Sequence, residues 1–231
     1  FSIYYYLVTK KINEVKTNSE FKAYLFLVFL FILIVTLGNL GLYGNFWKSL
    51  RYSSFQTLSI ITTTGFGTYD YTLWSSFSQA FLMILFFIGG CSGSTAGGIK
   101  IVRWVIAEKQ LKTETKILLH PQGVFSVRLN GSPIRKEIVS RVVAFMILYL
   151  ALVLFNMILG CIAHLDLLSS FSVSASMVGN IGPAFGNLGP SENLSQLPSW
   201  LKWFYSYAML AGRLELYTMI IFFLPEYWRN R

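Results

Sequence analysis

Residues 51–67 read RYSSFQTLSIITTTGFG. The first part, Arg51–Thr62, is rich in Ser and Thr and spans about 12 residues, whereas a membrane-crossing helix needs about 20 apolar residues. The end, Thr63-Thr64-Gly65-Phe66-Gly67, has the pattern Thr-x-Gly-aromatic-Gly, in which glycine lets the backbone turn successive carbonyl oxygens toward one axis. We interpret the segment as a helix that enters the membrane part-way and leads into a loop of carbonyl oxygens for a dehydrated cation. The alternative is an ordinary Ser/Thr/Gly loop between two helices.

The same plan recurs later in the chain. Leu167–Met177 is again a short segment rich in Ser, and Gly179-Asn180-Ile181-Gly182-Pro183 follows it. Here Asn-Ile-Gly replaces Thr-x-Gly, a change that coordination by main-chain atoms tolerates. Irregular backbone at membrane depth survives only where protein or a watery cavity surrounds it, and repeats in membrane proteins commonly surround a shared pathway. The sequence therefore predicts two pore loops, at residues 51–70 and 165–190.

The composition assigns both loops to a membrane protein. Of the 231 residues, 54% are hydrophobic, 17% are aromatic and only 13% are charged. Soluble domains carry about 25% charged residues, and disordered chains are polar and poor in aromatics, so both classes are excluded. Four apolar segments flank the two loops and are predicted to cross the membrane as helices: residues 23–43, 74–88, 142–163 and 203–224. The second of them continues without charge into a glycine-rich stretch that ends at Lys100.

Basic residues indicate the orientation. They concentrate before the first apolar segment, between the second and the third, and after the fourth, so they share one side, which the positive-inside rule makes cytoplasmic. The net charge of +9 therefore reflects topology, and no nucleic-acid-binding motif accompanies it. Cys91 and Cys161 lie in apolar stretches, and His120 and His164 stand alone, so the sequence predicts neither a disulfide framework nor a metal site made of side chains.

A glycine-rich stretch follows the second apolar segment. Residues 87–100 read FIGGCSGSTAGGIK. This glycine density gives too much backbone freedom for a continuous helix, so we expect a break in the helix with few side chains to lock it, suited to a movable gate. The alternative is close helix packing through small residues, since Gly89 and Gly93 have the Gly-x-x-x-Gly spacing.

Charged residues near the last apolar segment and between the spans are also informative. Arg213 falls inside the fourth predicted span, where it costs at least about 3 kcal/mol unless it faces a polar interior or a partner. It either lines a pore, pairs with Glu215 or caps helix carbonyls; direct pairing is disfavoured because residues two apart face different sides of a helix. Asp166 is predicted to cap the helix that follows it. Asp70, Asp166 and Glu192 make the outer mouth attractive to cations.

Residues 62–66, 87–100, 180–183 and 212–215 together resemble the Trk/Ktr/HKT superfamily of potassium transporters, most closely its TrkH/TrkG-type bacterial members. The resemblance implies an all-α integral membrane fold of four helix–re-entrant pore loop–helix repeats around one pseudo-fourfold, channel-like pore. This chain would supply the third and fourth repeats. The resemblance assigns the potassium-binding filter to the main-chain carbonyls of Thr63, Thr64, Gly65, Asn180, Ile181 and Gly182. It assigns the gate to the loop at residues 89–98, with Gly89, Gly90, Gly93, Gly97 and Gly98, together with Arg213.

The resemblance also implies a domain plan. Residues 1–22 would be the end of a preceding helix and a cytoplasmic linker, residues 23–119 one repeat, residues 120–139 a cytoplasmic linker and residues 140–231 the other repeat.

In function, the resemblance implies potassium uptake across the bacterial inner membrane by a multi-pass protein that is not an enzyme and holds no organic cofactor. The expected partners are lipid, an N-terminal half of the same polypeptide, a second copy of the protein, and a TrkA-like nucleotide-binding subunit docked on the basic face at residues 100–141. The alternative is symport, the coupled movement of potassium with sodium or protons. Symport favours titratable carboxylates inside the membrane, and Glu215 is the one candidate in the sequence.

Overall fold

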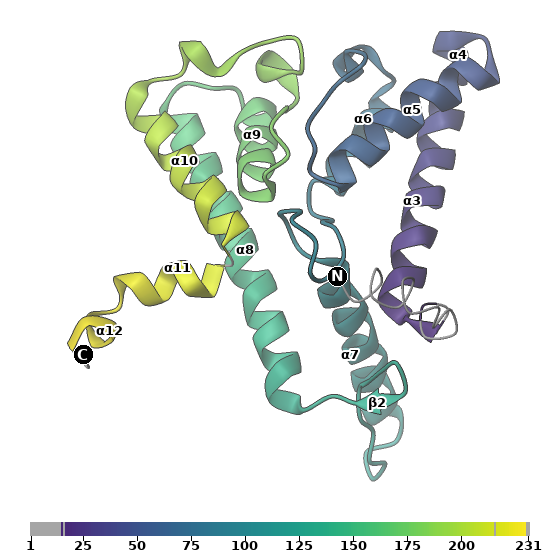
Figure 1. Ribbon diagram of the computed structural model, residues 1–231, viewed down its shortest axis with the longest axis vertical. Coiled ribbons are helices and arrows are strands. Elements are labelled where there is room, and N and C mark those ends of the chain that lie inside the picture. Colours follow the sequence, from purple (N-terminus) through teal and green to yellow (C-terminus); the bar gives the residue numbers. More distant parts are fainter. Residues whose placement is uncertain (1–14, 16, 215, 230–231) are drawn as a thin grey trace.

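The computed structural model describes residues 15, 17–214 and 216–229. Two helical groups stand side by side, and each corresponds to one of the two predicted repeats (Figure 1). The elements of the first group and of the segment that follows it are α3 (Ser19–Gly38), α4 (Leu40–Tyr43), α5 (Phe46–Ile61), η1 (Tyr71–Leu73), α6 (Ser76–Leu85) and α7 (Ile101–Leu119). Those of the second group are α8 (Lys136–Ile162), α9 (Leu167–Gly179), η2 (Gly186–Leu188), η3 (Leu194–Gln196), α10 (Ser199–Arg213), α11 (Leu216–Phe223) and α12 (Pro225–Arg229).

The connection between the groups contains a small antiparallel hairpin. Its strands are β1 (Arg128–Leu129) and β2 (Ser132–Pro133), with Arg128 opposite Pro133. The rest of the secondary structure that the structure describes is helical, so the predicted all-helical class holds with this one local exception.

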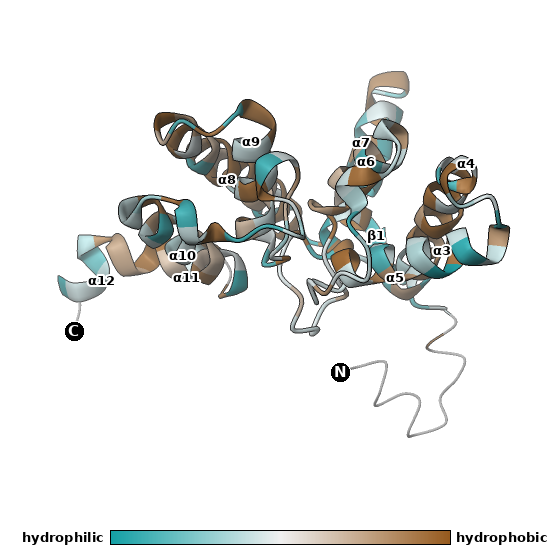
Figure 2. Cartoon of the chain, turned by 90° about the horizontal axis from the view of Figure 1, so that it is seen from above, coloured by the Kyte–Doolittle hydropathy of each residue, from teal (hydrophilic) through white to brown (hydrophobic). Residues whose placement is uncertain are grey.

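Two of the described helices, α3 and α8, are long and apolar enough to cross a membrane by length and composition. Hydrophobic residues dominate both (Figure 2). Only 22% of the apolar window of α3 and 28% of that of α8 are buried inside the protein. A helix with so much exposed apolar surface is suited to lipid rather than to water.

The fourth predicted span is wrong as a single helix. The helix α10 ends at Arg213, and α11 begins at Leu216 and leaves in a different direction (Figure 1). The chain packs closely just before the break, because a Cβ atom on Gly212 would lie 1.9 Å from the carbonyl oxygen of Val178. The end of α10 is therefore held against the end of α9, and the apolar residues beyond it form a separate helix.

The helices that precede the two predicted filter loops are longer than expected. The first, α5, begins at Phe46 rather than Arg51, because the Asn45 side chain accepts a hydrogen bond from the Trp47 amide and caps the helix there. The second, α9, continues to Gly179. Asp166 caps α9 as predicted, since its carboxylate accepts from the Ser169 amide at 3.1 Å.

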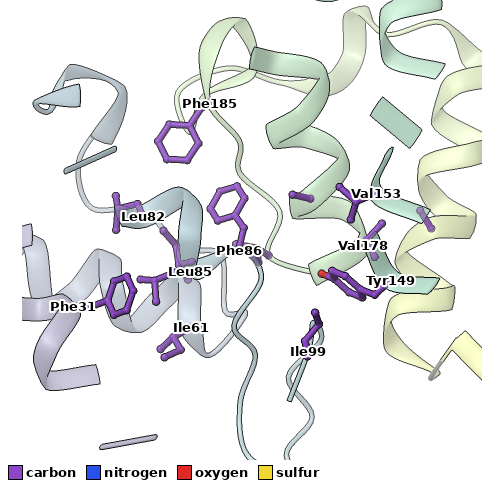
Figure 3. Close-up of a cluster of buried hydrophobic side chains, with 14 of the residues drawn as sticks. Phe31, Ile61, Leu82, Leu85, Phe86, Ile99, Tyr149, Val153, Val178 and Phe185 are labelled. Atoms are coloured by element: carbon purple, nitrogen blue, oxygen red, sulfur yellow. The ribbon is translucent and has the colours of Figure 1, made fainter. Parts of the chain in front are cut away.

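A shared hydrophobic core joins the two groups (Figure 3). The ring of Phe185 lies 4.8 Å from that of Tyr71 and 5.4 Å from that of Phe86. The Tyr71 hydroxyl also donates to the carbonyl of Ala184 at 2.8 Å. Burying a large apolar side chain contributes about 1.5–3 kcal/mol. These contacts therefore fix the position of the second predicted filter loop relative to the first.

Candidate functional site

The two predicted filter loops have the same backbone conformation. Thr63 and Gly65 have φ of 53° and 80°, and Asn180 and Gly182 have φ of 56° and 108°. Left-handed residues thus alternate with Thr64 and Ile181, which lie outside the left-handed region. Such alternation turns successive carbonyl oxygens to one side of the chain, whereas in a strand they point to opposite sides. Each loop therefore has the backbone pattern expected of a row of main-chain oxygens, the type of ligand that replaces the hydration shell of a cation.

Thr63 is the unexpected member of this pattern. A β-branched residue with positive φ is a genuine outlier, because its Cβ substituents collide with the backbone there. Such strain persists only where the surroundings impose it, and it concentrates at functional sites. Sequence reasoning predicted conformational freedom at Gly65 and gave no sign of a left-handed Thr63.

The two loops are in direct contact. A Cβ atom on Gly65 would lie 2.2 Å from the carbonyl oxygen of Ile181, so no side chain fits at Gly65. Both helices end where the loops begin, α5 at Ile61 and α9 at Gly179. The carbonyl end of a helix carries a partial negative charge, so two such ends face the place where the loops meet.

Two serines that sequence reasoning missed hold the loops. The Ser59 carbonyl accepts from the Thr64 amide at 2.9 Å, and the Ser176 carbonyl accepts from the Ile181 amide at 2.9 Å. The Ser59 hydroxyl donates to the carbonyl of Phe66 at 2.6 Å, and the Ser176 hydroxyl donates to that of Pro183 at 2.7 Å. A signal was present in the sequence, because each serine lies four residues before the first residue of its loop, Thr63 or Asn180.

The glycine-rich loop lies against both filter loops. The Gly97 amide donates to the Thr63 hydroxyl at 3.2 Å. On its other side, a Cβ atom on Gly97 would lie 2.4 Å from the carbonyl oxygen of Gly179. The loop also closes on itself, since the Gly89 amide donates to the Ile99 carbonyl at 2.9 Å. Substitution of Gly89 or Gly97 would therefore collide with backbone.

The other glycines of this loop differ in their surroundings. Gly93 and Gly98 have positive φ, of 78° and 72°. A Cβ atom on Gly90 would meet the side chains of Ser94 and Ala96 at 2.7 and 2.9 Å. The loop is also held from outside, because the Glu20 carboxylate of α3 accepts a hydrogen bond from the Ser92 amide. Sequence reasoning did not identify Glu20.

Arg213 lies at the end of α10, next to the contact between Gly212 and Val178. The Asn180 side-chain amide strengthens this junction by donating to the Met209 carbonyl at 2.9 Å. The Arg213 side chain is exposed. Its candidate partner Glu215 lies outside the described residues. Arg213 therefore directly follows Gly212, which packs against the end of α9, and it belongs to α10 rather than to the second filter loop.

Asp166 and Asp70, two of the acidic residues predicted at the outer mouth, each accept hydrogen bonds from neighbouring residues. Hydrogen bonding from Ser169 lowers the pKa of Asp166, which also accepts from the Asn187 side chain at 3.1 Å. Partial burial raises the pKa of Asp70, but hydrogen bonds from Thr72 and Ser191 outweigh it and the net pKa is lowered. Both carboxylates are therefore ionised at neutral pH.

Residues 27–230 match the TrkH family, described as cation transport protein. The chain belongs to this family. It is 35% identical over 215 residues to the Trk system potassium uptake protein TrkI of Halomonas elongata, and 36% identical over 216 residues to the Trk system potassium uptake protein TrkH of Vibrio parahaemolyticus. Each alignment covers 92% of this chain and 44% of the relative. The chain thus spans less than half the length of these relatives.

The fold comparison agrees. The crystal structure of the potassium transporter TrkH from Vibrio parahaemolyticus matches 91% of this TrkH-family chain and 45% of its own, with a TM-score of 0.84 and 33% identity. The predicted family and the mainly helical membrane fold are confirmed. The family consists of transport proteins, which agrees with the prediction that the chain is not an enzyme.

Proposed function

We propose that the chain forms part of a potassium-uptake pore in a bacterial inner membrane, with a filter made of main-chain carbonyls. The observation that supports this proposal is that the two loops share alternating left-handed residues, follow helix ends and touch at Gly65 and Ile181. Carbonyl oxygens at Thr63–Gly65 and Asn180–Gly182 replace the hydration shell of K⁺, so the ion enters without a large desolvation cost. The names of the relatives, potassium uptake proteins, support the choice of ion.

Two loops do not enclose an ion. Because the chain covers 44% of the length of its relatives, the proposal includes two further loops from the rest of the same polypeptide. A dimer, surrounding lipid and a TrkA-like nucleotide-binding subunit complete the proposed assembly. The exposed lysines of α7, Lys112 and Lys116, carry the positive charge that such a cytosolic subunit would meet.

The proposed gate consists of residues 89–98 and Arg213. The contacts of Gly97 with Thr63 and Gly179 support it, because a shift of this loop changes what lies against both filter loops. A fixed positive charge at Arg213 raises the barrier to cations. Replacing Arg213 with Ala should therefore increase K⁺ uptake by the full-length transporter about fivefold, and unchanged uptake would remove Arg213 from the gate.

The filter is tested with two glycines that differ chiefly in location. Gly182 and Gly131 both have positive φ, 108° and 85°, and both have open space at the Cβ position. Alanine strains the backbone at either site by about 1–2 kcal/mol, but only Gly182 belongs to a filter loop. In the full-length transporter, expressed in bacteria that lack other K⁺ uptake, Gly182→Ala should lower K⁺ uptake about tenfold while Gly131→Ala leaves it unchanged. Equal uptake by the two variants, at equal membrane levels, would overturn the filter.

The same assay separates a channel-like pore from symport. Uptake through a channel-like pore follows the membrane potential and is indifferent to a proton or sodium gradient. Dependence of the rate on either gradient would favour the coupled alternative.

A further inference from the structure

The outer ends of both filter loops are fastened by one hydroxyl each. The Ser59 hydroxyl donates to the Phe66 carbonyl at 2.6 Å, and the Ser176 hydroxyl donates to the Pro183 carbonyl at 2.7 Å. Phe66 and Pro183 are the residues directly after Gly65 and Gly182. Two separate segments of the chain therefore use the same side-chain type, the same position and nearly the same distance.

Burial makes these bonds consequential. Ser59 is 6% exposed and Ser176 is fully buried. A hydrogen bond contributes about 1 kcal/mol net, and here the donor hydroxyls are buried, whereas the acceptor residue Phe66 is exposed and Pro183 is half-buried. Removing either hydroxyl would therefore free a main-chain carbonyl to turn toward another partner.

For the proposed filter, the direction of these two carbonyls matters more than the energy of the hydrogen bonds that hold them. The carbonyls of Phe66 and Pro183 face their serines, back toward α5 and α9, and so end the row of oxygens that the preceding residues present. The Ser176 hydroxyl also accepts from the Gly182 amide at 3.0 Å, which fixes the peptide on the other side of Gly182. Each loop is thus held at its start by the serine carbonyl and at its end by the serine hydroxyl.

We propose that Ser59 and Ser176 are positioning residues that set where the proposed filter ends and how far apart its carbonyls lie. They do not touch the ion; they act through the carbonyls of Phe66 and Pro183. This inference rests on the proposed filter. Loss of either hydroxyl loosens the row of oxygens, so the site discriminates less well between K⁺ and the smaller Na⁺, whose fit requires the oxygens to move inward.

The experiment compares Ser59→Ala and Ser176→Ala with Ser174→Ala in the full-length transporter. Ser174 is a matched control, because it is fully buried on the same helix as Ser176 and its hydroxyl donates to the Ser170 carbonyl within that helix, at 2.7 Å. The assay measures the K⁺ concentration for half-maximal uptake and the inhibition of K⁺ uptake by Na⁺. We expect Ser59→Ala and Ser176→Ala to lower the K⁺ preference about fivefold and Ser174→Ala to leave it unchanged.

Ser59→Thr supplies the rescue, since it keeps the hydroxyl, and it should restore the K⁺ preference. If Ser176→Ala fails to accumulate in the membrane, Ser59→Ala alone tests the proposal. This variant should fold, because Phe66, whose carbonyl accepts from Ser59, is 71% exposed and packs against little of the protein. Unaltered K⁺ preference in Ser59→Ala, with K⁺ uptake by Gly182→Ala still lowered, would overturn the serine role and leave the filter standing. Unchanged K⁺ uptake and unchanged K⁺ preference in both Ser59→Ala and Gly182→Ala would overturn the filter and, with it, this inference.

Discussion

The two proposed filter loops share alternating left-handed residues but differ in what supports them. In the second loop, three serines of α9 bind the outgoing chain: Ser176 binds Gly182 and Pro183, Ser172 binds both main-chain groups of Phe185, and Ser169 accepts from the Asn187 amide. In the first loop, Ser59 is the matching serine, and Phe55 and Tyr52 occupy the positions that correspond to Ser172 and Ser169.

Aromatic rings replace the serines in the first loop. Tyr43 and Tyr52 stack at 5.2 Å, and Tyr69 lies 5.6 Å from Tyr52 and 6.4 Å from Trp74. The chain between the filter and these rings, Phe66–Thr68, is exposed, whereas Ala184 and Phe185 are buried. The alternating backbone pattern is thus common to both loops. The segment that follows it is supported by serine hydroxyls in the second loop and lies beside aromatic rings in the first.

The largest difference between the loops is expected at their glycines. A side chain at Gly65 would strike the Ile181 carbonyl at 2.2 Å, whereas one at Gly182 meets nothing within 4 Å. Gly65→Ala should therefore abolish K⁺ uptake, and Gly182→Ala should reduce it about tenfold through backbone strain alone. Uptake is measured with equal amounts of each variant in the membrane. A milder effect at Gly65 than at Gly182 would mean that the two loops do not touch in the working protein.

The second difference concerns stability. Ser172→Ala removes the donor and the acceptor that a fully buried hydroxyl provides to Phe185, and should lower the free energy of unfolding by about 1–3 kcal/mol. Tyr52→Leu removes ring stacking in the first loop and should cost about 0.5–1.5 kcal/mol. Thermal unfolding in detergent ranks the two variants. The reverse order would show that the rings, rather than the serines, provide the stronger support.

The third difference concerns the side chains that connect each filter loop to the proposed gate. The Thr63 hydroxyl binds the Gly97 amide, whereas the Asn180 amide binds Met209 of α10. Thr63→Val keeps the shape but loses the acceptor, so the glycine-rich loop should open more readily and raise K⁺ uptake about threefold. Asn180→Leu breaks the bond to α10 and leaves the hydrogen bond between Thr63 and Gly97 in place, but Leu at a φ of 56° also strains the second filter loop, so K⁺ uptake should fall rather than rise. A fall in uptake with Thr63→Val would contradict the role of this bond in keeping the loop closed.

The smallest difference lies at the caps of the two helices. Neutral Asn45 caps α5 and ionised Asp166 caps α9, so only the second helix should respond to pH. Because hydrogen bonding from Ser169 lowers the folded-state pKa of Asp166 below its ordinary value of 3.8, its contribution to stability is present above pH 3.8 and is lost as the pH falls through the lower folded-state pKa. The effect is under about 1 kcal/mol, since Asp166 is exposed. Asp166→Asn should keep the cap and abolish this pH dependence of the melting temperature; a dependence that persists would point to Asp70 instead.

Much of this arrangement was predictable from local sequence. The apolar segments, the two short Ser-rich helices, the Asp166 cap and the break at the glycine-rich stretch depend on composition and on neighbours within a few residues. The repeat of Ser59 and Ser176 at one spacing was also visible, although their role could not be predicted before the structure showed the carbonyls that accept from them.

The remaining features required the tertiary structure, because each depends on residues far apart in the chain. The fourth predicted span is broken after Arg213, next to the place where Gly212 packs on Val178, a contact that no local pattern encodes. Thr63 is left-handed against its own preference, where the Ser59 carbonyl binds the next amide and Gly97 binds its hydroxyl. Glu20 reaches Ser92 across the fold. Local propensities are worth tenths of a kcal/mol per residue, so where a close backbone contact or a buried hydrogen bond opposes them, the packing prevails.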